Sequence, residues 1–135
     1  MPLTTLVVED SARLDGPQNL RLDHPAWGDV ESAIRSMDGE HRSLVMLCPS
    51  ACEDILMGIG GGERGLCCCF TVDAQGDEFA LIDPAIHDET QVTFLMGELN
   101  TRPRNEHVTV AAVLEAAKWY FDKGDRDPRQ TWRAY

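Results

Sequence analysis

The hydrophobic positions of the chain form short runs through its first two-thirds and one long amphipathic stretch near its end. "TTLVVED" and "NLRLD" are rich in β-forming residues, and the segment between them ends in the turn-forming "DGPQ", which predicts a hairpin. Five further runs are bounded by turn residues and predict strands: "SLVMLC", "DILMGIG", "LCCCFTV", "EFALID" and "QVTFLM". "LCCCFTV" and "EFALID" flank "DAQGD", a connection of hairpin length. Strands linked so closely, with no helical pattern between them, indicate an antiparallel sheet.

Two segments show helical spacing instead. The first is "LDHPAWGDVESAIRSMDGE", in which Pro25 suits a first turn, acids follow it, and Gly39 comes after the last apolar residue. Its apolar stripe has three- and four-residue spacing and consists of Trp27, Val30, Ile34 and Met37.

The second helical segment is "HVTVAAVLEAAKWYFDKGDRDP", with Thr109 as the expected N-cap and Gly124 as the expected C-cap. Its predicted apolar stripe is Val110, Val113, Leu114, Ala117 and Phe121. The tail that follows contains Trp132, which we expect to pack back onto the body, and we also expect Trp27 and Trp119 to be core residues rather than interface residues. These elements predict one α+β domain over residues 1–135, a mainly antiparallel sheet with two principal helices packed against it.

Charge changes the picture of what the chain binds. It has 12 Lys and Arg against 23 Asp and Glu, a formal net charge of −11 and a pI near 4.6. Proteins that bind nucleic acid or anionic membranes directly do so through Lys and Arg, so these ligands are not expected. A basic protein partner suits this charge, although acidity for solubility alone would look the same. The chain shows neither a membrane span nor a signal peptide, so we expect a cytoplasmic protein with reduced cysteines.

The stretch "GIGGGERGLCCCF" at residues 58–70 invites a comparison with nucleotide-binding loops. A P-loop needs Lys and then Ser or Thr after its last Gly, and neither is present. Gly60, Gly62 and Gly65 match the spelling of a dinucleotide fingerprint, but that motif opens a helix, whereas "LCCCFTV" is strand-like. The glycines are better explained by a strand end, a turn and a close approach of the backbone.

The cysteines do not have the spacing of a metal site. In a strand, Cys67 and Cys69 share one face and Cys68 points to the other, while Cys48 and Cys52 do not form a zinc knuckle. We therefore expect buried core cysteines, with one reactive thiol as the open alternative. The four histidines are scattered and no hydrolase motif is present, so we expect neither cofactor, nor metal, nor catalytic activity.

Four segments together resemble the Imm-one family of immunity proteins from bacterial polymorphic toxin systems: "HPAWGDVESAIRSMDG", "DILMGIGGG", "EFALIDP" and "VLEAAKWYFDKGDRDPRQTW". The last is the most specific, with its Ala-rich helix, aromatic residues, short turn and lone Trp. The resemblance spans about residues 22–132. The N-terminal segment, and the "CCC" triplet within that range, are not features associated with the family.

The resemblance implies an α+β, non-catalytic inhibitor that binds a cognate secreted toxin domain and blocks its active site, protecting the producing cell. The toxins of this family are often deaminases, including cytosine deaminases that act on DNA. A deaminase needs a basic groove for its nucleic acid, and an acidic monomer could occupy that groove in a one-to-one complex.

The family supplies no binding residues that can be carried over to this chain. Charge alone suggests acids at sheet edges and loops as the partner-binding residues: Glu53, Asp54, Glu63, Asp73, Asp77, Glu78, Asp88 and Glu89.

Two other classes of protein remain open at this stage. A small acidic secretion chaperone dedicated to one effector would be an obligate dimer with a hydrophobic groove. A small enzyme using Cys or His would lose turnover when a single residue is replaced.

Overall fold

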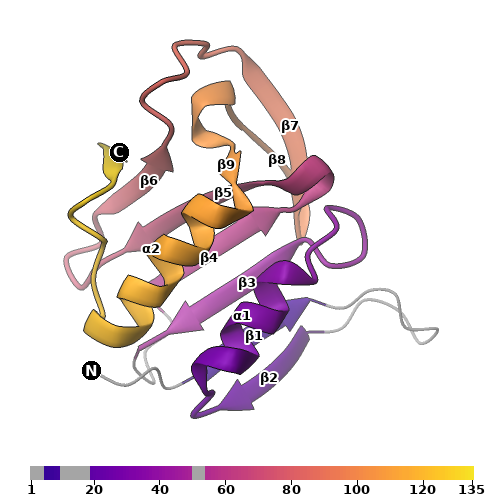
Figure 1. The fold of residues 1–135 in the computed structure, drawn as a ribbon, viewed down its shortest axis with the longest axis vertical. Coiled ribbons are helices and arrows are strands. Elements are labelled where there is room, and N and C mark those ends of the chain that lie inside the picture. The colour runs from indigo at the N-terminus through magenta and orange to yellow at the C-terminus, as the bar shows by residue number, and fades with distance from the viewer. Residues whose placement is uncertain (1–4, 10–18, 50–53) are drawn as a thin grey trace.

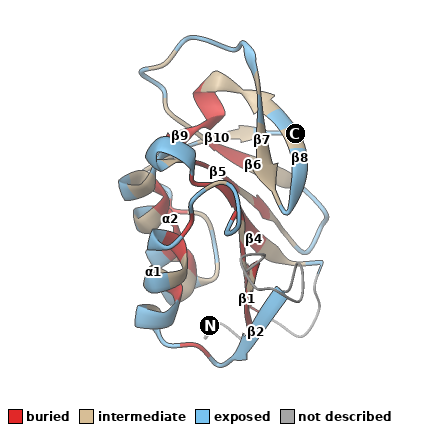
Figure 2. Cartoon of the chain, turned by 90° about the vertical axis from the view of Figure 1, so that its right-hand side faces the viewer, coloured by how far each residue is buried: buried red, intermediate tan, exposed pale blue. Residues whose placement is uncertain are grey.

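A computed structural model describes residues 5–9, 19–49 and 54–135, and in it two helices lie on one face of an antiparallel sheet (Figures 1 and 2). The strands of the main sheet are β1 (Thr5–Glu9), β2 (Asn19–Asp23), β3 (Leu44–Cys48), β4 (Leu56–Gly61), β5 (Leu66–Val72), β6 (Glu78–Ile82), β9 (Val108–Thr109) and β10 (Thr131–Ala134). Their order is β10-β6-β5-β4-β3-β1-β2, and the short β9 pairs with β5. The α+β fold predicted from the sequence is therefore confirmed.

Both predicted hairpins are present. β1 pairs antiparallel with β2, and β5 pairs antiparallel with β6 across the turn that contains Gly76. The tail predicted to dock on the body does so as a strand, because β10 pairs with β6 and sets Trp132 opposite Leu81. Its indole N–H donates a hydrogen bond to the carbonyl of Asp127 (3.0 Å).

The helices begin and end close to the predicted residues. α1 (Trp27–Arg35) is capped by Asp29, whose carboxylate accepts the N–H of Ala26 (2.8 Å). It ends at Arg35 with Ser36 as its C-cap, and Gly39 lies in the turn that follows.

The second helix, α2 (Val110–Lys123), confirms the predicted Thr109 N-cap and left-handed Gly124 C-cap. Its buried stripe differs from the prediction: Val113 and Ala117 are buried as expected, but Ala116 and Tyr120 complete the stripe. Leu114 and Phe121 lie at its edges, half-buried. The sequence pattern therefore located the helix, but its rotation against the sheet is set by the small alanines, which allow close approach.

The hydrophobic core fills the space between the helices and one face of the sheet (Figure 2). Alternate residues of each central strand enter it, among them Val45, Leu47, Met57 and Ile59. Trp27 and Trp132 pack against this core as predicted. Trp119 does not belong to it; instead the cations of Lys123 and Arg129 lie 6.0 Å and 5.0 Å from the centroid of its ring.

The opposite face of the sheet is partly covered by a separate hairpin, β7 (Gln91–Met96) and β8 (Glu98–Pro103). β4 permits its approach because Gly60 has no side chain: a Cβ there would lie 2.3 Å from Cγ of Met96. Gly58 likewise makes room for the ring of Phe70. The predicted role of these glycines in close packing is thus confirmed, and the conformations of Gly61 and Gly62, with positive φ, turn the chain into β5.

Candidate functional site

The acids proposed from charge alone lie in separate parts of the molecule. Glu53 is outside the described residues. Asp54 lies just before β4, and Asp73 and Asp77 are the first and last residues of the β5–β6 turn. Asp73 has a structural role there, since its carboxylate accepts the N–H groups of Gln75 and Asp77 at 3.0 Å each. These three acids therefore share one end of the sheet, but at least one of them shapes its turn.

Two others, Glu78 and Glu89, take part in a network of ion pairs. Glu78 pairs with Arg102 (3.3 Å) and Glu89 with Arg133 (2.8 Å). At the centre of this network lies Glu106, only 1% exposed, which sequence reasoning did not single out.

Side chains from β8, β10 and the residue after β10 bind the carboxylate of Glu106. Arg133 Nη1 of β10 donates to it at 2.8 Å, Arg102 of β8 lies 3.7 Å away, and the Tyr135 hydroxyl also donates to it. The guanidinium of Arg102 also stacks on the Tyr135 ring, 5.0 Å from its centroid. The network therefore ties β8 and β10 to the loop before β9, and its acids are already neutralised by arginines within the chain.

Asp88 also stabilises its own loop. Its carboxylate accepts the N–H of Thr90 (2.8 Å), and its carbonyl accepts the N–H of Asn105 (3.1 Å). Hydrogen bonds from Thr90 lower the pKa of this carboxyl group below its usual value, so it is a stable anion on the surface.

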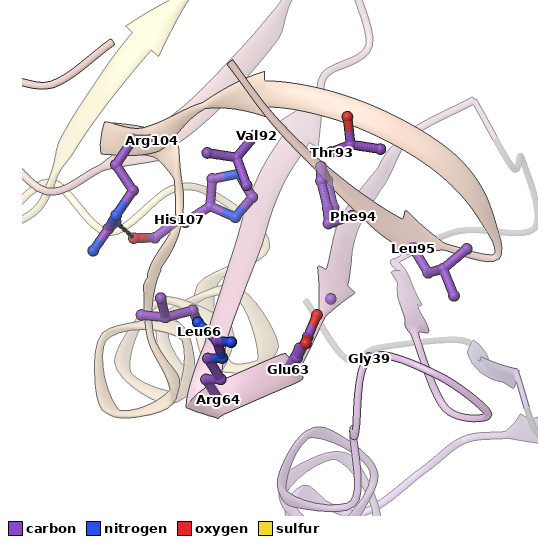
Figure 3. A pocket seen from close by; sticks show the side chains of 11 residues that line it. Gly39, Glu63, Arg64, Leu66, Val92, Thr93, Phe94, Leu95, Arg104 and His107 are labelled. Carbon is purple, nitrogen blue, oxygen red and sulfur yellow. Dashed lines mark hydrogen bonds between the residues drawn. The ribbon is translucent and has the colours of Figure 1, made fainter. Parts of the chain in front are cut away.

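The remaining predicted acid, Glu63, lies in a different setting, at the mouth of a cleft of about 350 Å³ (Figure 3). One wall is formed by Glu63 and Arg64 of the turn between β4 and β5 and by Leu66, the first residue of β5. The other wall is β7, from Val92 to Leu95.

The far end of this cleft is closed by Arg104 and His107. Arg104 Nη1 donates to the carbonyl of His107 (2.9 Å), as the dashed line in Figure 3 shows. The His107 ring lies edge-on to Phe94, with centroids 5.0 Å apart. Burial lowers the pKa of His107, which favours the neutral imidazole. Apolar walls with a few charged groups at the mouth can hold a polypeptide segment.

The cysteines behave as the strand alternation predicts. Cys67 and Cys69 are in the core between sheet and helices, whereas Cys68 is buried on the opposite face. Burial raises the pKa of Cys67 to about 11 and raises those of Cys68 and Cys69 as well, so all three are neutral thiols. Cys48 is also buried, and Cys52 lies outside the described residues.

In the described part of the chain, no group of three or more His, Cys, Asp or Glu side chains is placed to hold a metal ion. No described helix is long and apolar enough to cross a membrane.

Comparison with known proteins gives information on the family that the geometry of the site does not provide. No curated protein matched the chain. The family model described as Immunity protein Imm1 matches residues 21–134, from β2 to β10. This range contains both helices and the cleft, and agrees with the resemblance drawn from the sequence segments. The chain therefore belongs to the Imm1 family of immunity proteins.

Proposed function

We propose that this protein binds a cognate secreted toxin domain, a cytosine deaminase acting on nucleic acid, and blocks its active site so that the producing cell survives. The family match over residues 21–134 carries the proposal. The protein is an inhibitor rather than an enzyme, acts in the cytoplasm, and forms a one-to-one complex as a monomer.

The net charge of −11 supports a partner whose own ligand is a polyanion. A toxin that captures a nucleobase holds the neighbouring phosphates with basic residues. An acidic protein is attracted to that basic groove and can take the place of the phosphates, which raises the association rate most strongly at low salt.

Of the predicted acids within the described residues, Glu63 is the strongest candidate for contact with the toxin. It is exposed at the mouth of the cleft, and no ion pair joins it to a described cation, whereas Glu78 and Glu89 are paired within the chain. Asp54, Asp77 and Asp88 are exposed as well and could contribute to long-range attraction.

The test combines binding with inhibition. The toxin domain encoded next to this chain's gene is purified, titrated with the protein by calorimetry, and assayed for deamination of a nucleic-acid substrate. We expect tight binding at a ratio of one to one and complete loss of deamination.

Other outcomes would point to other functions. Binding without inhibition, together with a dimer in size-exclusion chromatography, would replace the proposal with a secretion chaperone. Inhibition of a toxin that does not deaminate nucleic acid would keep the immunity function and refute the deaminase target.

A further inference from the structure

We infer that β7 is the strand to which the toxin adds an extended segment of its own, so that the complex continues the β7–β8 sheet across the cleft. This inference rests on the proposed function and specifies the surface through which it would operate. It follows from the backbone, the sequence and the surroundings of β7.

The backbone of β7 has one unpaired edge. Within the described residues, β7 pairs only with β8. The carbonyl of Thr90 accepts the N–H of Arg104 (2.8 Å). Because hydrogen-bonded and non-hydrogen-bonded residues alternate in an antiparallel pair, every second residue counted from Thr90 bonds to β8. Gln91, Thr93 and Leu95 therefore direct their N–H and C=O groups away from β8. No described backbone group outside the hairpin bonds to them.

The cleft lies along this edge. It is lined by the four consecutive residues from Val92 to Leu95, whose side chains alternate between the two faces of the strand. A cavity beneath one face of the strand would be lined by only every second residue, so this lining by consecutive residues indicates that the cleft lies at the edge. An incoming strand would lie about 4.8 Å from β7, between it and the wall formed by Glu63 and Leu66.

The sequence of β7 lacks the usual protection of an edge strand. Soluble proteins block exposed edges with charged residues, Pro or bulges. β8 contains Glu98, Arg102 and Pro103, and β2 contains Arg21 and Asp23.

β7 by contrast reads "QVTFLM", with neither charge nor Pro over six residues. Such a segment is prone to pair with other chains. An unprotected edge above an open cleft is therefore best explained by a partner that pairs with it, the mode of recognition known as strand addition.

The surroundings indicate the chemistry of the added segment. Phe94 and Leu66 line the cleft and favour apolar side chains at every second position of the segment. The exposed acids Glu40 and Glu63 lie in turns near β7, and the exposed Glu98 is the first residue of β8; no described ion pair joins any of them to a cation. Two arginines also line the cleft: Arg64 at the mouth, and Arg104, which is held by the carbonyl of His107, at the far end. The segment is thus an extended strand of the toxin with an uncharged centre and basic flanks.

The hairpin offers a matched pair of variants. Thr93 and Thr101 are exposed, lie directly opposite each other and contact through their hydroxyls (3.3 Å). The backbone N–H of each threonine points away from the other strand of the hairpin. The N–H of Thr93 faces the cleft, whereas the N–H of Thr101 faces the opposite edge of the hairpin. Thr93→Pro removes a donor from the proposed interface, whereas Thr101→Pro makes the same change at the opposite edge.

Both variants are titrated against the purified toxin domain after circular dichroism has confirmed that they fold. We expect Thr93→Pro to weaken binding at least about tenfold and Thr101→Pro to stay within about threefold of the wild type. A folded Thr93→Pro variant that binds and inhibits like the wild type would overturn the inference while leaving the proposed function intact. A wild-type protein that does not bind the toxin would overturn both.

Amide hydrogen exchange on the wild-type protein gives a second measurement that needs no variant. In the free protein, we expect fast exchange at Gln91, Thr93 and Leu95, and slower exchange at the residues between them. The toxin should protect these three amides, so that the alternation disappears. Persistence of the alternation in the complex would overturn the inference.

Discussion

At the scale of single residues, the least expected feature is the buried carboxylate of Glu106. An isolated buried charge is costly, and it is tolerated only when ion pairs and hydrogen bonds compensate it. Here Arg133, Arg102 and Tyr135 provide that compensation from two strands that are remote in sequence. Sequence reasoning could not find this cluster because nothing in "PRNEHV" distinguishes a buried Glu from an exposed one; the signal is the pairing of β10 with β6.

Replacing Glu106 tests how much this network stabilises the fold. Glu106→Gln removes the buried anion that the partly buried guanidinium groups of Arg102 and Arg133 share, and leaves them only the more exposed Glu78 and Glu89, so we expect a loss of about 2–4 kcal/mol in the free energy of unfolding. Urea denaturation measures the change. The matched control is Glu89→Gln, at the 67% exposed end of the same network, where the loss should stay below about 1 kcal/mol. Equal losses in the two variants would contradict the central role of Glu106.

His107 predicts a dependence of stability on pH. Its pKa is lowered in the folded protein, mainly by burial, so the unfolded chain takes up a proton at a higher pH than the folded chain does. The contribution of His107 to stability is therefore complete above its unfolded pKa, near 6.5, and is lost as the pH falls below that value. His107→Gln should show a smaller fall in melting temperature between pH 7 and pH 5 than the wild type. Parallel curves would refute this.

At the scale of elements, local patterns predicted most of the structure. Both helices, the two hairpins, and strands β3 to β7 lie where apolar runs and turn residues place them. β8 and β10 were not predicted, because "ELNTRP" and "TWRA" are short, polar and without clear alternation. Each becomes a strand through its partner, β7 for one and β6 for the other. Of the candidate site, charge suggested Glu63, which stays a prediction, and β7 could be recognised as an edge only once the sheet was known.

The contact between β4 and the β7–β8 hairpin predicts the effect of adding one methyl group. Gly60→Ala places a Cβ against Met96, so the hairpin must shift, and we expect a loss of about 1–3 kcal/mol. Gly28→Ala is the control, since that exposed position in α1 meets no atom within 4 Å and should gain up to about 1 kcal/mol. Thermal denaturation of both variants measures the difference, and an unchanged stability of Gly60→Ala would show that the hairpin is free to move.

At the scale of the whole molecule, negative charge is spread over both ends of the sheet. Under the proposed function, the acids at the β5–β6 turn and the acid at the cleft would both contribute to long-range attraction, but only the latter lies beside the edge of β7. Attraction and contact can therefore be separated by experiment.

Glu63→Lys and Asp77→Lys make the same charge change at opposite ends of β5. Both should slow association with the toxin at low salt by a similar factor, and this effect should shrink as salt screens it. Only Glu63→Lys should also speed up dissociation, by about tenfold or more, at all salt concentrations. Stopped-flow and surface plasmon resonance measurements give the two rates. Faster dissociation of Asp77→Lys alone would move the contact to the other end of the sheet.

The alternation of side chains along the β7–β8 hairpin has a consequence for how such a protein can diversify. Met96 and Phe94 face the body and hold the hairpin in place, while Thr93 and Leu99 lie outside that contact, with Leu99 73% exposed. Mutations at the outer positions are thus nearly neutral for folding, so drift can explore them freely. A lineage could follow a changing toxin by altering these positions, without a compensating change in its core.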